Sequence, residues 1–255
     1  MKKAFLTFAL CMSAAMLSGA ATGAETGPVR EFYVCNFNEG KGLADLMSVR
    51  DFLVKQIDQI GSEDLSAMES FVWVPYMSST AADYMWFNMS ENLNAWGRAV
   101  DAFNNSDEGA AVGQRSSEVS HCVGAGLVTH EQIYDGGEAI NPPEGASALL
   151  ETFACELEDG KTLADARAAV EYWQGVIKGL GTHTSYVAYM QTPLVNESPY
   201  DLFYFAVHNN ATDYAARQTA VLTSKDGAEA NRRFAEVQRC AAGLYWGTPI
   251  ITPDQ

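Results

Sequence analysis

The sequence predicts an α+β fold made of two tandem copies of one βαββαβ unit. The first observation is a near repetition, because "CNFNEGKGLADL" begins at Cys35 and "CELEDGKTLADA" begins at Cys155. The second is that strand-like and helix-like segments follow both motifs in the same order. The third is a stretch rich in Gly and Pro, "DGGEAINPPEGASA" at 135–148, between the copies. Self-similarity at a fixed spacing indicates a duplicated unit, and Gly and Pro mark the break between units.

The internal alignment extends well beyond the opening motif. At a constant shift of 120 residues, a first set of identities pairs Lys41, Leu43, Ala44, Asp45 and Gly61 with Lys161, Leu163, Ala164, Asp165 and Gly181. At a shift of 118 residues, a second set pairs Asp83, Phe87, Asn92, Gly109, Glu118, Val119 and Cys122 with Asp201, Phe205, Asn210, Gly227, Glu236, Val237 and Cys240. Each copy has roughly one hundred residues, which is long enough for its own core. We therefore predict a cleaved signal peptide at 1–24, a first repeat at 29–134, a linker at 135–148 and a second repeat at 149–250.

Each copy contains four segments that are typical of strands, because they are rich in β-branched and aromatic residues. They lie at 30–37, 70–77, 83–90 and 121–128 in the first copy, and at 151–157, 185–192, 201–208 and 239–246 in the second.

Helical segments stand between these strands in both copies. Apolar spacing predicts a helix at 42–61 and its counterpart at 162–181, each ended by a glycine. A second helical region runs from Asn92 to Val119 with a break near 104–107, and its counterpart runs from Asn210 to Val237 with a break near 224–227. Thr162 and Asp165 have the spacing of a capping box, so we interpret the aspartate shared by both copies as a helix-start carboxylate.

This order of elements is the split βαβ, or ferredoxin-like, arrangement. Two such units in one chain resemble the tandem form of the dimeric α/β-barrel superfamily. The resemblance covers nearly the whole mature chain and rests on element order and duplication, not on a catalytic motif. It implies that the two sheets face each other and enclose an α/β barrel, as a pseudo-dimer within one chain. The superfamily includes cofactor-free monooxygenases, haem enzymes, small-molecule lyases and proteins of unknown role, and no functional residue is carried over from it.

The four cysteines of the mature chain allow three disulfide connectivities. In the ferredoxin-like unit the last strand lies antiparallel beside the first, which brings the two cysteines of each copy together. We therefore predict the disulfides Cys35–Cys122 and Cys155–Cys240. A metal site is disfavoured, because the sequence has no Cys-x-x-Cys spacing.

The predicted cysteine pairs also set the strand register. Asn36 then faces His121, and Glu156 faces Arg239, on the opposite side of the sheet. We expect the set of strand residues with polar tips to face the barrel interior and the purely apolar set to face the helices. This expectation gives eight candidate ligand-binding residues, namely Asn36, Trp86, Asn88, His121, Glu156, Tyr204, His208 and Arg239. The alternative is that these side chains only pack, with Glu156–Arg239 a structural ion pair.

The N-terminus and the charge indicate an exported protein. Lys2 and Lys3 precede a short apolar run and then small residues, with cleavage after Ala20, Ala21 or Ala24, as in a bacterial secretory signal peptide. No later apolar run is long enough for a membrane helix. Loss of two of the 16 Lys and Arg leaves 14 against 32 Asp and Glu, which makes nucleic acid an improbable partner. A periplasmic or secreted location follows.

Two functions are compatible with the sequence. The first is a binding or interaction protein whose barrel holds a small apolar ligand, without a cofactor or metal, and acts as a monomer because the duplication supplies the second half. The alternative is an enzyme, either similar to cofactor-free monooxygenases or dependent on haem. His121 or His208 would then be a general base or an axial haem ligand, and Arg239 would stabilise an anion.

Overall fold

The structure is a computed structural model that describes residues 27–79, 81–140, 142, 147–181, 185–196 and 199–252. The predicted signal peptide at 1–24 lies outside the described residues, as do residues 141 and 143–146 of the predicted linker. None of the described helices is long and apolar enough to span a membrane.

The element order confirms the α+β fold with two similar halves. The first half contains β1 (Val29–Phe37), α1 (Leu43–Ile60), α2 (Glu63–Ser66), β2 (Glu69–Met77), β3 (Tyr84–Ser90), α3 (Leu93–Asn104), α4 (Asp107–Ser117), β4 (Ser120–Thr129) and β5 (Glu131–Asp135). The second contains β6 (Ala148–Leu157), α5 (Leu163–Leu180), β7 (Tyr186–Gln191), β8 (Pro193–Asn196), β9 (Leu202–His208), α6 (Ala211–Thr223), α7 (Lys225–Val237) and β10 (Gln238–Ile251). Each predicted second helical region is a pair of helices that meet at the predicted break.

The aspartate shared by both halves starts the first long helix in each. Asp165 accepts a hydrogen bond from the backbone N of Thr162 at 2.9 Å, and Asp45 accepts one from the backbone N of Gly42 at 3.1 Å. Gly61 and Gly181 end these helices with φ values of 66° and 65°, which a glycine adopts without strain. The interpretation of this aspartate as a helix-start carboxylate is confirmed.

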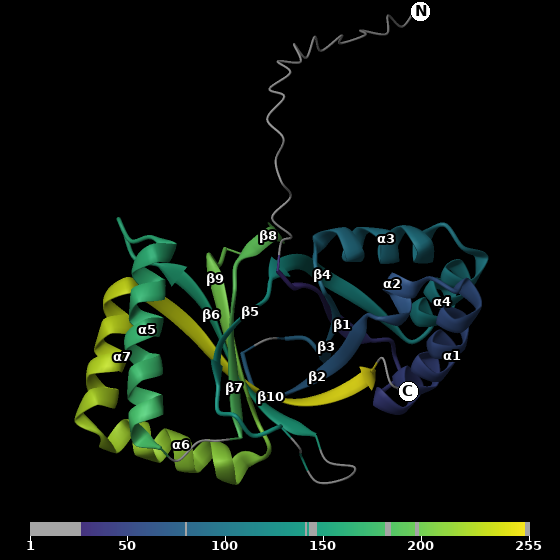
Figure 1. Ribbon diagram of the computed structural model, residues 1–255. Coiled ribbons are helices and arrows are strands. Elements are labelled where there is room, and N and C mark those ends of the chain that lie inside the picture. Colours follow the sequence, from purple (N-terminus) through teal and green to yellow (C-terminus); the bar gives the residue numbers. More distant parts are fainter. Residues whose placement is uncertain are drawn as a thin grey trace, which may run out of the picture.

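One antiparallel sheet runs through both halves in the order β5-β7-β9-β6-β10-β2-β3-β1-β4-β8. The long strand β10 leaves the second half and pairs with β2 of the first (Figure 1). At the other junction, β4 pairs with β8 and β5 pairs with β7. Thr129 and Thr192 join these pairs through a backbone hydrogen bond of 2.9 Å and a side-chain hydrogen bond of 2.7 Å. Because β5 continues β4 and β8 continues β7, the two ends of the strand order meet and the sheet closes into a barrel.

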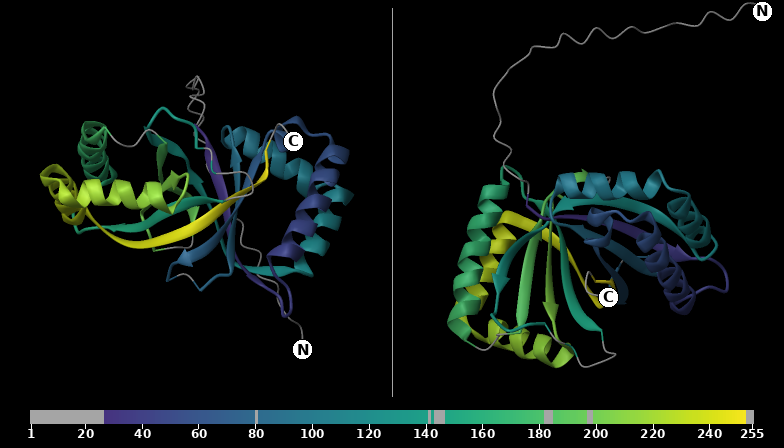
Figure 2. Two further views of the ribbon diagram at one scale, coloured as in Figure 1. Left: turned by 90° about the horizontal axis from the view of Figure 1, so that it is seen from below. Right: turned by 45° about the vertical axis from the view of Figure 1, so that its right-hand side comes forward.

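The helices lie outside the barrel, in two groups on opposite sides. Figure 2 shows α1 to α4 against the first half and α5 to α7 against the second. Ring contacts cross the barrel between strands that are not neighbours: Trp73 and Phe205 have centroids 5.2 Å apart, and Phe32 and Phe203 are 6.3 Å apart. The two sheets therefore face each other, as the resemblance implies.

The prediction of which strand face points inward was wrong. The inner cluster consists of apolar residues from both halves, namely Trp73, Phe87, Leu150, Phe205 and Tyr245, with Phe32, Phe71, Met85, Tyr189 and Val207 against it. Trp86 instead packs in the cluster below α1 and α3, and Tyr204 packs against Phe234 of α7.

Polar tips are tolerated on the helix-covered face because neighbouring strands supply their partners. Asn88 accepts hydrogen bonds from Trp86 Nε1 at 2.7 Å and from Ser70 Oγ at 2.8 Å. It also donates to Glu31 Oε2 at 3.0 Å. A polar tip therefore does not mark the interior of this barrel.

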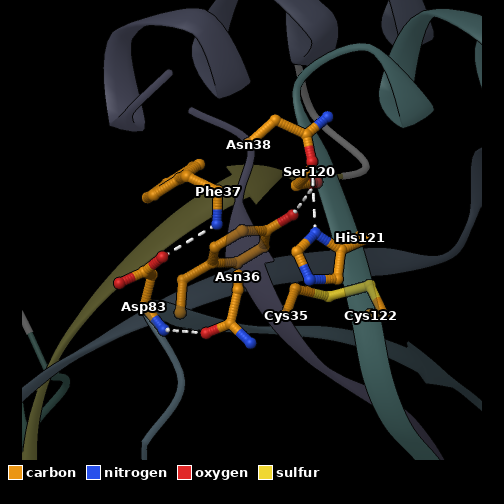
Figure 3. The surroundings of a disulfide bond; sticks show 9 residues. Cys35, Asn36, Phe37, Asn38, Asp83, Ser120, His121 and Cys122 are labelled. Carbon is orange, nitrogen blue, oxygen red and sulfur yellow. Dashed lines mark hydrogen bonds between the residues drawn. A yellow bond between two sulfur atoms is a disulfide. The ribbon is translucent and has the colours of Figure 1, made fainter. Parts of the chain in front are cut away.

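Both predicted disulfides are present, Cys35–Cys122 and Cys155–Cys240. The predicted register is also confirmed, since Asn36 pairs with His121 and Glu156 with Arg239. Figure 3 shows the first disulfide joining β1 to β4, with Asn36 turned towards Asp83 and His121 towards Asn38. Each disulfide thus joins the first strand of a half to the long strand that closes it.

Removal of either disulfide should destabilise the protein strongly. The bonds close loops with sequence separations of 87 and 85 residues. For such loops the chain-entropy model gives about 4 kcal/mol each. We expect C35A/C122A and C155A/C240A each to lower the free energy of unfolding by about this amount in urea titrations. Unchanged stability, or a peptide map that links one half to the other, would contradict the assignment.

His130 is a buried histidine at the kink between β4 and β5. Its ring stacks on Tyr189 and Phe205 at 4.4 and 5.3 Å, and its Nδ1 lies 3.0 Å from Gln191 Nε2. Burial, helped by the positive charge of Arg30, lowers the pKa of His130 to about 3. The neutral imidazole is therefore the folded form at every physiological pH.

His130 should make the folded state sensitive to acid. In the unfolded chain the pKa of His130 is about 6.5. The contribution of the neutral imidazole to the free energy of unfolding is therefore fully present above pH 6.5, and it is lost as the pH falls towards the pKa of the folded state. Between pH 7.5 and pH 5 the wild type should lose about 2 kcal/mol more than His130→Gln, measured by urea titration at each pH. Parallel pH profiles for the two proteins would refute this origin.

Candidate functional site

A cavity of about 300 Å³ lies between the sheet and the helices of the second half. Strands β5, β6, β7, β9 and β10 line it on the sheet side, and α5, α6 and α7 line it on the other side. Aromatic side chains supply most of the lining, including Phe153, Trp173, Tyr186, Tyr204 and Phe234. A concave apolar space of this size with a few polar groups is the usual form of a small-molecule site.

A buried ion pair stands in this cavity. Glu151 on β6 is 5% exposed and Arg217 on α6 is 4% exposed, and Arg217 Nη2 donates to Glu151 Oε2. Gln218 Nε2 donates to the other carboxylate oxygen. Asn210 caps α6 by accepting from the backbone N of Asp213 at 2.9 Å, which holds the start of the helix at the end of β9. The arginine therefore reaches the strand from a rigid helix.

The cavity surroundings change the acidity of its ionisable groups. Burial raises the pKa of Glu151, although Arg217 and Gln218 act in the opposite direction. Burial also raises the pKa of Tyr204 to about 12, and its hydroxyl donates to Gln238 Oε1 at 3.1 Å. The carboxylate is thus held in an apolar site and the phenol keeps its proton, which are features of functional sites.

The two halves have diverged at the positions that form this cavity. Glu31 is the counterpart of Glu151 at the shift of 120, and Asn88 fills the space beside it. In the second half Asn88 is replaced by Ala206, and Ala99 of α3 is replaced by Arg217 of α6. A smaller residue on the strand leaves room, and a longer one on the helix supplies a charged partner for the carboxylate.

Four of the eight predicted site residues lie at the ends of the cysteine-bearing strands and do not form a pocket. Asn36 Oδ1 accepts from the backbone N of Asp83 at 3.2 Å, and His121 is exposed. Arg239 lies with its Nη2 3.7 Å from Glu156, and its side chain is 72% exposed. The structure supports a surface ion pair for Glu156 and Arg239.

The other four predicted residues lie on the helix-covered face. Trp86 and Asn88 fill the first half, as described above. Tyr204 lines the cavity of the second half, and His208 lies close to it, with its ring 5.0 Å from that of Tyr186 and 5.3 Å from that of Tyr214. The prediction therefore found one lining residue and one neighbour of the cavity, although it placed both on the wrong side of the sheet.

Glu151 and Arg217 were missed by the sequence prediction. One signal was available for the glutamate, because "ALLETFACEL" places a carboxylate inside an apolar strand and the first copy has Glu31 at the same position. Arg217 had no such signal, because its counterpart in the first copy is the uncharged Ala99.

The residues of this cavity do not fit haem, one of the cofactors that the resemblance implies. Haem iron is held in proteins by His, Met, a Cys thiolate or Tyr. Of the described residues that line the cavity, none is a histidine or a methionine, and Cys240 is in a disulfide. Burial raises the pKa of both lining tyrosines, Tyr186 and Tyr204, so each keeps its proton. In the described part of the chain, moreover, no group of three His, Cys, Asp or Glu is placed to hold a metal ion.

Solved structures show which fold this is. The chain matches a chlorite dismutase mutant from Candidatus Nitrospira defluvii with a TM-score of 0.53 and 12% identity, over 89% of this chain and 93% of that one. It matches a putative monooxygenase from Fusobacterium nucleatum subsp. nucleatum with a TM-score of 0.56 and 8% identity, over 88% and 93%. No protein-family model and no curated protein sequence matches. The chain has the dimeric α/β-barrel fold in tandem form, which these proteins share.

Breaking the buried ion pair should cost more than removing it. Arg217→Met leaves a buried carboxylate without its cation, so we expect a loss of about 3 to 5 kcal/mol in the free energy of unfolding at pH 8. E151L/R217M removes both charges and should recover most of this loss.

The matched control is Arg167→Met, which breaks the exposed pair with Glu131 and should cost less than about 1 kcal/mol. If E151L/R217M loses as much stability as Glu151→Leu and Arg217→Met lose in total when measured separately, the pair is not coupled.

Proposed function

We propose that this chain is an exported small-molecule-binding protein whose site is the Glu151–Arg217 cavity of the second half. The supporting observation is an apolar space of about 300 Å³ that is lined by a carboxylate, a guanidinium and three amide side chains. The two disulfides are consistent with an oxidising compartment, in keeping with the predicted periplasmic or secreted location.

The chemistry of the cavity favours a flat, uncharged ligand. Glu151 and Arg217 neutralise each other, so the cavity carries no net charge to attract an ion. Aromatic walls favour an aromatic ligand, and the amides of Gln218 and Gln238 favour a polar substituent on it.

An enzyme is the second candidate, and two observations favour it. The structural neighbours are named as enzymes, and a carboxyl group with a raised pKa inside a cavity is suited to general acid–base catalysis. Glu151 would then transfer the proton. If the wild type chemically converts a bound compound and Glu151→Gln does not, the chain is an enzyme and the binding proposal is replaced.

Binding can be tested with 2-naphthol, a flat aromatic probe with one hydroxyl group. We expect saturation-transfer NMR to detect its binding to the wild type. Ala206→Phe, which fills the cavity floor, should weaken binding at least about tenfold, because the probe and the new ring would occupy the same space. Ala216→Phe, on the exposed side of α6, is the matched control and should bind as the wild type does. Equal binding by both variants would place the site elsewhere.

A further inference from the structure

Arg30 is a buried cation inside the barrel, on the face of the sheet opposite to the Glu151–Arg217 cavity. It lies on β1 and is 3% exposed. Its guanidinium carbon lies 3.8 Å from the ring centroid of Phe87, 4.2 Å from that of Trp73 and 4.5 Å from that of Phe205. Three aromatic faces from both halves therefore surround one positive charge.

The charge of Arg30 has no counter-charge in the described part of the chain. None of the ion pairs found there includes it, and its buried Nη1 has no hydrogen-bond partner. Aromatic rings attract the face of a guanidinium, but its N–H groups point outward in its own plane and need acceptors there. Burial lowers the pKa of Arg30 without removing its charge at neutral pH. A buried cation in this state lacks an anion.

Two cavities lie near Arg30, although Arg30 itself lines neither of them. An open cleft of about 760 Å³ at the end of the barrel is lined by Val29, His130 and Tyr189. An inner cavity of about 220 Å³ is lined by the same three rings that surround Arg30 and by Gln191. His130 of the cleft and Gln191 of the inner cavity contact each other, with 3.0 Å between Nδ1 and Nε2.

The groups around Arg30 leave its charge intact. His130 is neutral, and burial raises the pKa of Tyr189, so neither one neutralises the arginine. The carboxylates of Glu69, Glu91 and Glu131 lie along the cleft, and Glu131 is paired with Arg167 at 2.7 Å. An anion that reaches the interior would thus meet one cation and walls that are mostly apolar or aromatic, with no carboxylate among the described residues that line the inner cavity.

We propose that the barrel interior binds a small monocarboxylate, with its apolar body in the inner cavity and its carboxylate on the N–H groups of Arg30. The fork of a guanidinium matches the two oxygens of a carboxylate. The aromatic lining fits an apolar body, and the cavity volume limits that body to roughly one ring. Arg30 does not line the Glu151–Arg217 cavity, although Phe153, Tyr204 and Phe205 line both that cavity and the inner one.

The experiment compares benzoate with benzamide, which has the same shape and no charge. With the full mature chain, benzoate should raise the melting temperature and bind at least about ten times more tightly than benzamide in calorimetry. Equal binding of the two compounds would overturn the proposal, because the charge of Arg30 would then play no part.

Arg30→Met tests the residue itself. The variant removes a buried, uncompensated charge, so we expect a higher melting temperature without ligand and no response to benzoate. Arg115→Met is the matched control, because Arg115 lies 4.9 Å from the Phe52 ring on the surface, and it should keep the benzoate response. A benzoate response that survives in Arg30→Met would overturn the assignment.

Two further variants separate the remaining outcomes. Arg30→Lys keeps the positive charge but loses the paired N–H donors of the guanidinium. We expect it to bind benzoate more weakly than the wild type and still to prefer benzoate to benzamide. Loss of that preference would count against the proposal even if Arg30→Met failed to fold. Ala206→Phe should leave the benzoate response unchanged. If Ala206→Phe abolishes it, benzoate binds in the other cavity and the barrel site is refuted, while the proposed function stands.

Discussion

The pairing of β10 with β2 is the constraint on which the rest of the molecule depends. Together with the junction at Thr129 and Thr192, it turns two four-stranded units into one closed sheet. Closure removes the open edges that two separate units would expose. It also gives every strand residue one of two environments, the shared interior or a helix-covered face, because side chains alternate along a strand. The buried Arg30 and the Glu151–Arg217 pair lie on these two different faces.

Most of the fold could be predicted from the sequence, because duplication supplies two independent samples of each element. Agreement between the copies identified the strands, the capping aspartate and both disulfides. The junction strands β5 and β8 were not predicted, since each pairs with a strand of the other half and not within its own unit. The sequence pattern indicates the elements that pair within one copy, whereas these two strands form the junction between the halves.

The candidate sites were harder to predict for a physical reason. Alternation separates strand residues into two sets, but it does not say which set faces inward. We took polar tips as the mark of the interior, whereas Trp86 and Asn88 satisfy each other on the helix-covered face. Arg30 contradicts the usual pattern most clearly, because a charged residue occupies the most aromatic part of the core. Only coordinates show three rings from two halves meeting around it.

The exchange of strands between halves has an evolutionary consequence. A single unit cut from this chain would lose the partner of β2 or of β7 and would present bare backbone groups to water. Each half therefore depends on the other to close its sheet, which favours retention of the duplication. The two copies could then diverge in sequence. The second copy has Ala206 and a cavity beside Glu151, where the first copy has Asn88 beside Glu31.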